Sequence, residues 1–391
     1  MQPSSLPSGL PEPDAQTLAH SAQVAEFIAA EIDRSGGRIS FGEFMQHALY
    51  APGLGYYVAG SRKFGPDGDF VTAPEVSPLF GRVVAAQCAT VLSQLPQGNV
   101  LEIGAGSGAL AEQMLKKLAE LEILPSRYLI LEVSPELAER QRDRLSVALP
   151  ELADRFAWVD AVPDGFEGVI VANEVADALP VERFRIGADG IEQAVVVHGA
   201  DGFAERWQPA STVLNEAVDA LGLDLDRGYE SEICLPLKAW TGDLLGNLQR
   251  GLVLLFDYGL SRREYYAPER SGGWLRCHFR HRAHSAPLVL PGVQDLTAWV
   301  DFTSIAEIAS EQGAAVAGFV TQAMFLLHGN LQNEFTDAAS SSLVDQAELS
   351  RQIKLLTLPD EMGEHFKCLG LSKGELDVPD ALTGADRAGM L

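Results

Sequence analysis

The sequence Asn99-Val-Leu-Glu-Ile-Gly-Ala-Gly-Ser-Gly-Ala-Leu-Ala-Glu-Gln113 joins a short apolar run to three alternating glycines. The apolar residues Val100–Ile103 predict a buried strand, and Ala109–Leu121 predicts a helix. The glycines at 104, 106 and 108 allow the backbone to turn sharply and to lie against a ligand, because no Cβ stands in the way. A strand, a glycine turn and a helix in this order predict a nucleotide-like ligand at the carboxyl end of the strand.

Strand and helix candidates alternate on the C-terminal side of this segment. Four further strands of the same sheet are expected at Tyr128–Val133, Phe156–Val159, Val169–Ala172 and Leu252–Phe256. Helices at Ala109–Leu121 and Pro135–Leu149 separate the early strands, so we expect a parallel sheet with helices on both faces. Two more strands are predicted at Ala315–Val320 and Ala323–Leu327, and a helix at Leu343–Leu355.

About 80 residues between the fourth and fifth strands predict an insertion with its own strands and helices. Its expected strands are Arg183–Ile186, Ile191–Val197 and Phe203–Trp207, and its expected helices are Thr212–Ala220 and Leu237–Leu248. The predicted domain organisation is therefore a flexible tail over 1–16, N-terminal helices and a covering loop over 17–96, a core over 97–330 with an insertion at 180–250, and a C-terminal helical extension over 331–391.

Composition restricts the classes of partner. The chain has 391 residues, 47% of them hydrophobic, and a net charge of −25, which argues against nucleic acid because binding there needs a positive field. No run of about 18 apolar residues predicts a membrane span, and the N-terminus does not resemble a signal peptide. Four separated cysteines indicate reduced thiols, so we expect a cytoplasmic protein. The sequence leaves open whether the protein is a monomer or a homodimer.

The residues around the glycine turn favour S-adenosylmethionine over a dinucleotide, although the turn alone does not distinguish them. Glu102 precedes the first glycine by two residues, where an acid can hold the amino group of an amino-acid moiety. The turn (Gly104, Ala105, Gly106, Ser107, Gly108) has no Lys or Arg to meet phosphates. Glu132 ends the second strand, where a carboxylate can accept both ribose hydroxyls of either ligand. Asp160 closes the third strand, where it can accept from an adenine amino group or be a solvated loop acid.

A second group of polar residues follows the fourth strand. Asn173 and Glu174 come directly after the apolar run, and Asp177 follows three residues later, on the same face if the chain turns helically. Such acids can also be an ordinary acidic helix start, which the helix dipole favours. If they face a pocket, two carboxylates suit a guanidinium, which they grip bidentately. Its pKa above about 12 prevents prior deprotonation, so carboxylates would localise its charge away from the attacking nitrogen.

Two other segments invite a functional interpretation. Asp257-Tyr258 follows the fifth strand, where it is either a structural turn or part of a substrate wall. Cys277-His278-x-x-His281-x-x-His284 contains metal-ligand residue types, but its spacing differs from the usual zinc motifs and no acid stands nearby, so no metal is expected.

Several long motifs together resemble the MidA family of S-adenosylmethionine-dependent methyltransferases over about residues 17 to 370. The motifs are Phe41-Gly-Glu-Phe-Met-Gln-His-Ala-Leu-Tyr-Ala-Pro-Gly-Leu-Gly-Tyr-Tyr57, Gly68-Asp-Phe-Val-Thr-Ala-Pro-Glu-Val-Ser-Pro-Leu-Phe-Gly81, Asn173-Glu-Val-Ala-Asp-Ala-Leu-Pro180, Phe256-Asp-Tyr-Gly259, His281-Arg282 and Pro291-Gly-Val-Gln-Asp-Leu-Thr-Ala-Trp-Val-Asp-Phe302. The resemblance implies a class I, Rossmann-like fold: a seven-stranded, mostly parallel sheet with an N-terminal helical segment and a large α+β insertion.

The resemblance also implies a reaction, ω-N dimethylation of an arginine on a partner protein. The family's mitochondrial member is a complex I assembly factor that methylates a core subunit. Carried over to this sequence are the glycine turn, Glu132 and Asn173-Glu174-x-x-Asp177, with Thr72, Ala73 and Pro74 in the motif expected to cover the cofactor. His281 and Arg282 are expected to orient loops or meet the substrate protein. Val175-Ala176 departs from the bulkier apolar residues of relatives, which affects the substrate slot.

Three other functions are compatible with these residues. A methyltransferase for another acceptor would differ in its product. An NAD-dependent oxidoreductase would bind nicotinamide. A non-catalytic assembly factor that keeps the fold would still support its partner complex after loss of cofactor binding.

Overall fold

A computed structural model describes residues 6–59, 71–338 and 343–391. Contacts divide the chain into two compact units. Unit 1 combines the described residues within 1–70 with Asp177–Leu237 and Arg262–Trp299, whereas unit 2 comprises Val71–Ala176, Lys238–Ser261 and Val300–Leu391. Most of the predicted insertion therefore belongs to unit 1 and the glycine turn belongs to unit 2, whereas the predicted N-terminal segment over 17–96 is divided between the two units.

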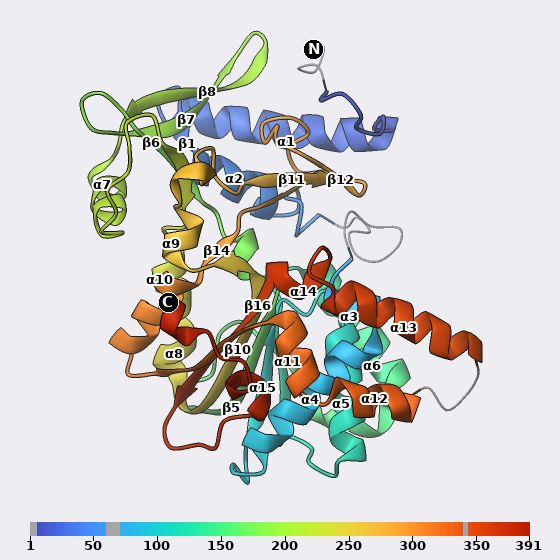
Figure 1. Ribbon diagram of the computed structural model, residues 1–391. Helices are drawn as coiled ribbons and strands as arrows, with labels where there is room; N and C mark the ends of the chain where they lie inside the picture. Colours follow the sequence, from blue (N-terminus) through green and yellow to red (C-terminus); the bar gives the residue numbers. More distant parts are fainter. Residues whose placement is uncertain (1–5, 60–70, 339–342) are drawn as a thin grey trace. The chain divides into compact units, whose positions relative to one another are not determined.

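The centre of unit 2 is a twisted sheet with strand order β15-β16-β10-β5-β2-β3-β4 (Figure 1). The strands are β2 (Asn99–Ile103), β3 (Tyr128–Leu131), β4 (Phe156–Val159), β5 (Phe166–Asn173), β10 (Leu248–Leu260), β15 (Ala315–Thr321) and β16 (Phe366–Lys373), and β14 (Val300–Asp301) pairs with β10. All neighbours from β10 to β4 pair in parallel, whereas β16 is antiparallel to both β10 and β15. This path of seven strands confirms the predicted mostly parallel sheet.

The last strand of that sheet differs from the prediction. Ala323–Leu327 was expected to be a strand but lies in helix α11 (Gln322–His328), where the Thr321 side chain caps the helix by accepting from Met324 N. A short apolar run does not by itself distinguish a strand from a buried helix, and here the cap determines the outcome. The strand that completes the sheet is β16, within the segment predicted as a helical extension.

Helices cover both faces of this sheet. Figure 1 shows α4 (Pro78–Leu92), α5 (Ala109–Glu120) and α6 (Pro135–Ala148) on one side, and α8 (Leu237–Asn247) and α10 (Phe302–Glu311) on the other. The buried apolar side chains of α4 and α5 pack with those of β2, β3, β5 and β10 into one core. The remaining helices of unit 2 are α3 (Ala73–Val76), α12 (Leu331–Ala338), α13 (Leu343–Thr357), α14 (Met362–His365) and α15 (Asp380–Thr383).

Unit 1 contains two smaller antiparallel sheets. The first has the order β1-β7-β6-β9, with β8 paired to β7. Its strands are β1 (Ile39–Ser40), β6 (Glu182–Ile186), β7 (Ile191–Gly199), β8 (Gly202–Pro209) and β9 (Glu230–Ile233), so the predicted insertion strands are confirmed. The second sheet has the order β12-β11-β13, formed by β11 (Arg276–Phe279), β12 (Arg282–His284) and β13 (Asp295–Thr297).

Helices α1 (Ala15–Arg34), α2 (Phe41–Tyr50), α7 (Thr212–Asp219) and α9 (Arg262–Tyr265) complete unit 1. A capping box begins α2: Glu43 N donates to the Ser40 side chain, and the Glu43 carboxylate accepts from Ser40 N. Apolar residues of α1 and α2 pack into a core of their own, which includes Ile28, Phe44 and Val196. Within the described ranges, no helix is long and apolar enough to cross a membrane.

Candidate active site

The register of the parallel strands aligns the predicted cofactor residues at one edge of the unit 2 sheet. Ile103 pairs with Leu131 and with Ala172, and Leu131 pairs with Val159. The following residues therefore emerge at the same level of four adjacent strands: Gly104, Glu132, Asp160 and Asn173. Open α/β sheets bind their ligands at this carboxyl edge.

The glycine turn has the backbone conformation that its sequence predicts. Gly104, Gly106 and Gly108 have φ angles of +64°, +54° and +79°, the left-handed region that side chains rarely adopt. Gly108 is the N-cap of α5 and has no side chain to close the helix end. A Cβ on Gly104 would lie 3.0 Å from Cγ2 of Val175, so the glycine turn contacts the segment after β5 directly.

Glu102 lies beneath this turn as a buried acid. Its side chain is 2% exposed and accepts a hydrogen bond of 2.6 Å from the Tyr128 hydroxyl. Burial raises the pKa of Glu102 to about 7, because the charged form loses its hydration; the Tyr128 hydrogen bond offsets part of the rise, and the charge of Glu132 adds to it. This carboxyl can therefore change its charge near neutral pH.

The raised pKa of Glu102 predicts a pH-dependent affinity for the amino-acid part of the cofactor. If Glu102 holds the ligand's ammonium group, only its ionised form can pair with it. Affinity for S-adenosylhomocysteine should be full above about pH 7 and should fall below it, by up to about tenfold per pH unit. Calorimetric titrations at several pH values measure this dependence.

Adenosine is the matched control ligand for this experiment, because it lacks the amino-acid moiety and should therefore lack the part of the pH dependence that comes from Glu102, while keeping any part that comes from Glu132. The Glu102→Gln variant should bind S-adenosylhomocysteine weakly at every pH. An equal pH dependence for both ligands, or for the variant and the wild type, would exclude Glu102 from this contact.

Glu132 directly follows β3 and is held from two sides. Its Oε1 accepts from Ser134 N at 3.0 Å, and its Oε2 accepts from Gln141 Nε2 at 2.9 Å. Burial raises the pKa of Glu132, and these hydrogen bonds partly oppose that rise. The exposed Asp160 follows β4 one strand further along the edge. Both positions agree with the predicted placement, and their ligand contacts stay predictions.

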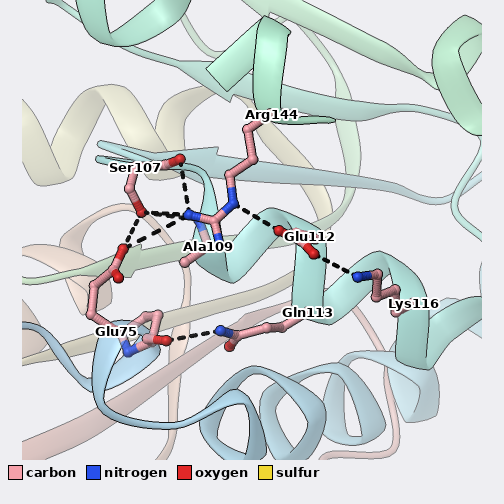
Figure 2. A network of polar contacts seen from close by, with 8 residues as sticks. Glu75, Ser107, Ala109, Glu112, Gln113, Lys116 and Arg144 are labelled. Atoms are coloured by element: carbon pink, nitrogen blue, oxygen red, sulfur yellow. Dashed lines mark hydrogen bonds and ion pairs between the residues drawn. The ribbon is translucent and has the colours of Figure 1, made fainter. Parts of the chain in front are cut away.

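Polar contacts join helix α3 to the glycine turn (Figure 2). The Ser107 hydroxyl donates to the Glu75 carboxylate, and Arg144 Nη1 donates to Ser107 Oγ at 3.2 Å. Gln113 Nε2 also donates to the carbonyl oxygen of Pro74 at 2.8 Å. The predicted cofactor-covering residues 72–74 therefore lie in a segment tied to the turn, whereas residues 68–70 of the same motif are outside the described residues.

Removing the Ser107 hydroxyl should loosen this tie. In Ser107→Ala, Glu75 and Arg144 both lose a partner, and a hydrogen bond to a charged group contributes roughly 1.5–3 kcal/mol. We expect S-adenosylhomocysteine to dissociate about tenfold faster, measured by stopped-flow displacement. Lys116→Ala is the control, because Lys116 pairs with Glu112 at the exposed end of the same network, where ion pairs contribute little. Equal dissociation rates for Ser107→Ala and wild type would contradict a role for this tie.

The turn after β5 holds Glu174 in a strained conformation. Its φ is +54°, which is rare for a residue with a side chain, and Glu174 N donates to Phe256 O at 2.8 Å. The carboxylate accepts from Asn173 Nδ2 at 3.2 Å and from Ala73 N at 3.4 Å, so it lies between its own turn and the start of α3. Such strain persists only where the surroundings enforce it, and it is concentrated at functional sites.

Asp257 supplies that enforcement. It is 2% exposed, and its Oδ2 accepts from Ala176 N at 2.9 Å and from Val175 N at 3.3 Å. Its Oδ1 accepts from Tyr258 N at 2.9 Å. Of the two sequence-based interpretations, the structural turn is therefore what these contacts form, and a substrate contact for Asp257 or Tyr258 stays a prediction.

The other predicted site residues belong to unit 1. Asp177 is 4% exposed, and its carbonyl oxygen accepts from Ala298 N at 2.9 Å. His281 and Arg282 are exposed on the β11–β12 hairpin, where Arg280 and His281 have φ angles of +47° and +60°. Positive φ at both central residues defines a type I′ turn, so this segment is a tight hairpin. Across the described residues, no three His, Cys, Asp or Glu side chains come together as a metal site.

Sequence reasoning missed Gln141, Glu75 and Arg144. For Gln141 a signal is present, because it falls on the apolar stripe of its helix, four residues after Leu137 and four before Leu145. A polar residue at a core position requires a buried partner. Glu75 and Arg144 carry no such signal, since their pairing depends on segments far apart in sequence.

Comparisons with known proteins agree with this geometry. The model of a family described as "Putative S-adenosyl-L-methionine-dependent methyltransferase" matches residues 83–320. A Drosophila melanogaster protein named "Protein arginine methyltransferase NDUFAF7 homolog, mitochondrial" is 30% identical over 93% of this chain and 89% of its own length. The Homo sapiens protein named "Protein arginine methyltransferase NDUFAF7, mitochondrial" is 27% identical over 86% of this chain and 81% of its own length. A Burkholderia thailandensis structure with bound S-adenosyl-homocysteine is 39% identical, with a TM-score of 0.93 over 98% of this chain and 100% of the other. The chain thus belongs to this family of S-adenosyl-L-methionine-dependent methyltransferases.

Proposed function

We propose that this protein transfers methyl groups from S-adenosylmethionine to an arginine guanidinium of a partner protein. The observation that carries the proposal is the placement of Glu174: a strained acid directly after β5, beside the glycine turn and the start of α3. The names of the Drosophila and human relatives, which are protein arginine methyltransferases, support the same reaction.

The cofactor site fits the nucleoside and amino-acid parts of S-adenosylmethionine. The three glycines of the turn offer backbone without side chains, Glu132 presents a carboxylate directly after β3, and Glu102 can carry a charge near neutral pH. We assign the ribose to Glu132, the amino group to Glu102 and the adenine amino group to Asp160, with Thr72–Pro74 covering the ligand. When bound, the cofactor supplies an electrophilic methyl carbon.

The acids after β5 can compensate for the poor nucleophilicity of a protonated guanidinium. A guanidinium is protonated at any physiological pH, so its attacking nitrogen is a poor nucleophile until the positive charge is drawn elsewhere. We propose that Glu174 and Asp177 grip the guanidinium, orient one nitrogen and localise the charge on the others. Asn173, whose amide already donates to Glu174, shapes the junction between donor and acceptor.

The proposed partner is a protein of the respiratory complex I subunit type, with an arginine that can enter the site. This follows from the family resemblance, and His281 and Arg282 on the exposed hairpin are candidate contacts for that protein. The high negative charge of the chain, −25, favours a substrate segment that carries further positive residues.

Capture of the partner tests this proposal. Affinity-tagged wild-type enzyme loaded with S-adenosylhomocysteine should retain the partner, because it keeps every group that binds the guanidinium and has no methyl group to transfer. Proteins enriched on this complex are then incubated with active enzyme and S-adenosylmethionine, and their peptides are mapped by mass spectrometry. New methylation confined to arginine supports the proposal, whereas methylation of lysine, glutamine or a small molecule identifies another acceptor.

A further inference from the structure

Gln141 is a fully buried amide between the two predicted cofactor elements. It lies on α6 with 0% of its side chain exposed. Its Nε2 donates to Gly106 O at 3.0 Å and to Glu132 Oε2 at 2.9 Å, and its Oε1 accepts from Trp158 Nε1 at 2.9 Å. One side chain thus connects the glycine turn, the acid after β3 and a side chain of β4.

The orientation of this amide is determined by its partners. An indole nitrogen can only donate, so Trp158 requires the carbonyl oxygen of Gln141 on its side. Both amide hydrogens must then face Gly106 O and the Glu132 carboxylate, which can only accept. No rotated amide satisfies all three partners, so Gln141 has a single arrangement that matches its surroundings.

We propose that Gln141 is a positioning residue of the cofactor site, which sets the Glu132 carboxylate and the glycine turn at the spacing needed to bind a nucleoside. The proposal rests on the ribose contact proposed for Glu132. One oxygen of that carboxylate accepts from Ser134 N and the other accepts from Gln141, and the backbone N–H groups of Gly106 and Val133 also stabilise its charged form. Because Gln141 is itself held by Gly106 O and Trp158, it fixes the orientation in which the Glu132 carboxylate faces two neighbouring hydroxyls.

Two substitutions separate positioning from packing. Gln141→Met keeps most of the side-chain volume but removes all three polar contacts. Gln141→Glu keeps the shape and an oxygen for Trp158, yet it places a second acid against Glu132 and removes the donors. If Gln141 only filled space, Gln141→Glu would be the milder change; if it positions Glu132, Gln141→Glu is the more harmful one.

Calorimetric binding of S-adenosylhomocysteine is the readout. We expect the Kd to rise roughly tenfold in Gln141→Met and further in Gln141→Glu, because hydrogen bonds to a charged group are lost. In a Glu132→Ala background, Gln141→Met should add at most a few-fold, since the residue through which Gln141 acts is gone. Gln87→Met is the control for loss of a buried amide, because Gln87 lies on α4 and donates to Gly329 O rather than to a predicted cofactor residue.

The outcomes separate this inference from the proposed role of Glu132. An unchanged Kd in Glu132→Ala overturns the ribose contact and the inference with it. A large loss in Glu132→Ala together with an unchanged Kd in both Gln141 variants overturns the inference alone. The inference is also overturned if Gln141→Met raises the Kd by the same factor in wild type and in Glu132→Ala. It is supported if Gln141→Met raises the Kd more in wild type than in Glu132→Ala and if the Gln141 variants have thermal midpoints like that of Gln87→Met.

Discussion

Glu174→Gln should lower kcat/KM for arginine methylation by about 10²- to 10⁴-fold while the Kd for S-adenosylhomocysteine changes little. The variant keeps the shape of the side chain and an oxygen for Asn173 and Ala73 N. It removes the charge that faces the guanidinium, and losing one partner of a buried charge pair costs about 3–5 kcal/mol. Initial rates with saturating cofactor and varied protein substrate measure the loss.

Glu167→Gln is the matched control, because Glu167 lies near the opposite end of the same strand β5 (Phe166–Asn173) and should leave the rate unchanged. Combining Glu174→Gln with Asp177→Asn tests whether the two acids act on one group. In that case the fold-loss of kcat/KM in the double variant should be smaller than the product of the fold-losses in the two single variants. A rate for Glu174→Gln close to that of wild type would remove Glu174 from the reaction.

Asp257→Ala should lower the free energy of unfolding by about 3 kcal/mol or more and abolish methyl transfer. Three backbone donors, at Val175, Ala176 and Tyr258, depend on this one carboxylate. Each buried donor left without a partner costs about 1–3 kcal/mol, and the strained turn at Glu174 loses the contacts that enforce it. Denaturant unfolding followed by circular dichroism measures the loss of stability.

Asp243→Ala provides the comparison for Asp257→Ala, since Asp243 is an exposed acid on α8 and its loss should change stability by less than about 0.5 kcal/mol. Asp257→Asn should fall between the two, because an amide keeps one oxygen acceptor. Full activity and an unchanged denaturant midpoint in Asp257→Ala would show that the turn is maintained by other contacts.

The order of elements in the sheet could be predicted because each strand of its parallel half is a local apolar run. Val100–Ile103 and Val169–Ala172 are bounded by polar or glycine residues, and parallel register then aligns the residues that follow them. Gly104, Glu132 and Asp160 therefore reached one edge as expected. That alignment needed no knowledge of distant contacts.

The parts that could not be predicted depend on such contacts. Strand β16 has lysines near both ends and glycine within it, so its sequence favours no element until it pairs between β10 and β15. The same holds for Asp257, whose carboxylate acts on residues about 80 positions earlier. The sequence places Asp257 directly after an apolar strand, but only the fold shows which backbone groups its carboxylate holds.

Transfer of an isotopically labelled methyl group is the most direct test of the central claim. Purified enzyme, labelled S-adenosylmethionine and the captured partner protein are incubated together, and the partner is analysed by peptide mass spectrometry. The account predicts labelled methyl groups on arginine with wild type and a strongly reduced yield with Glu174→Gln. Label on a residue other than arginine, or equal labelling by wild type and Glu174→Gln, would contradict it.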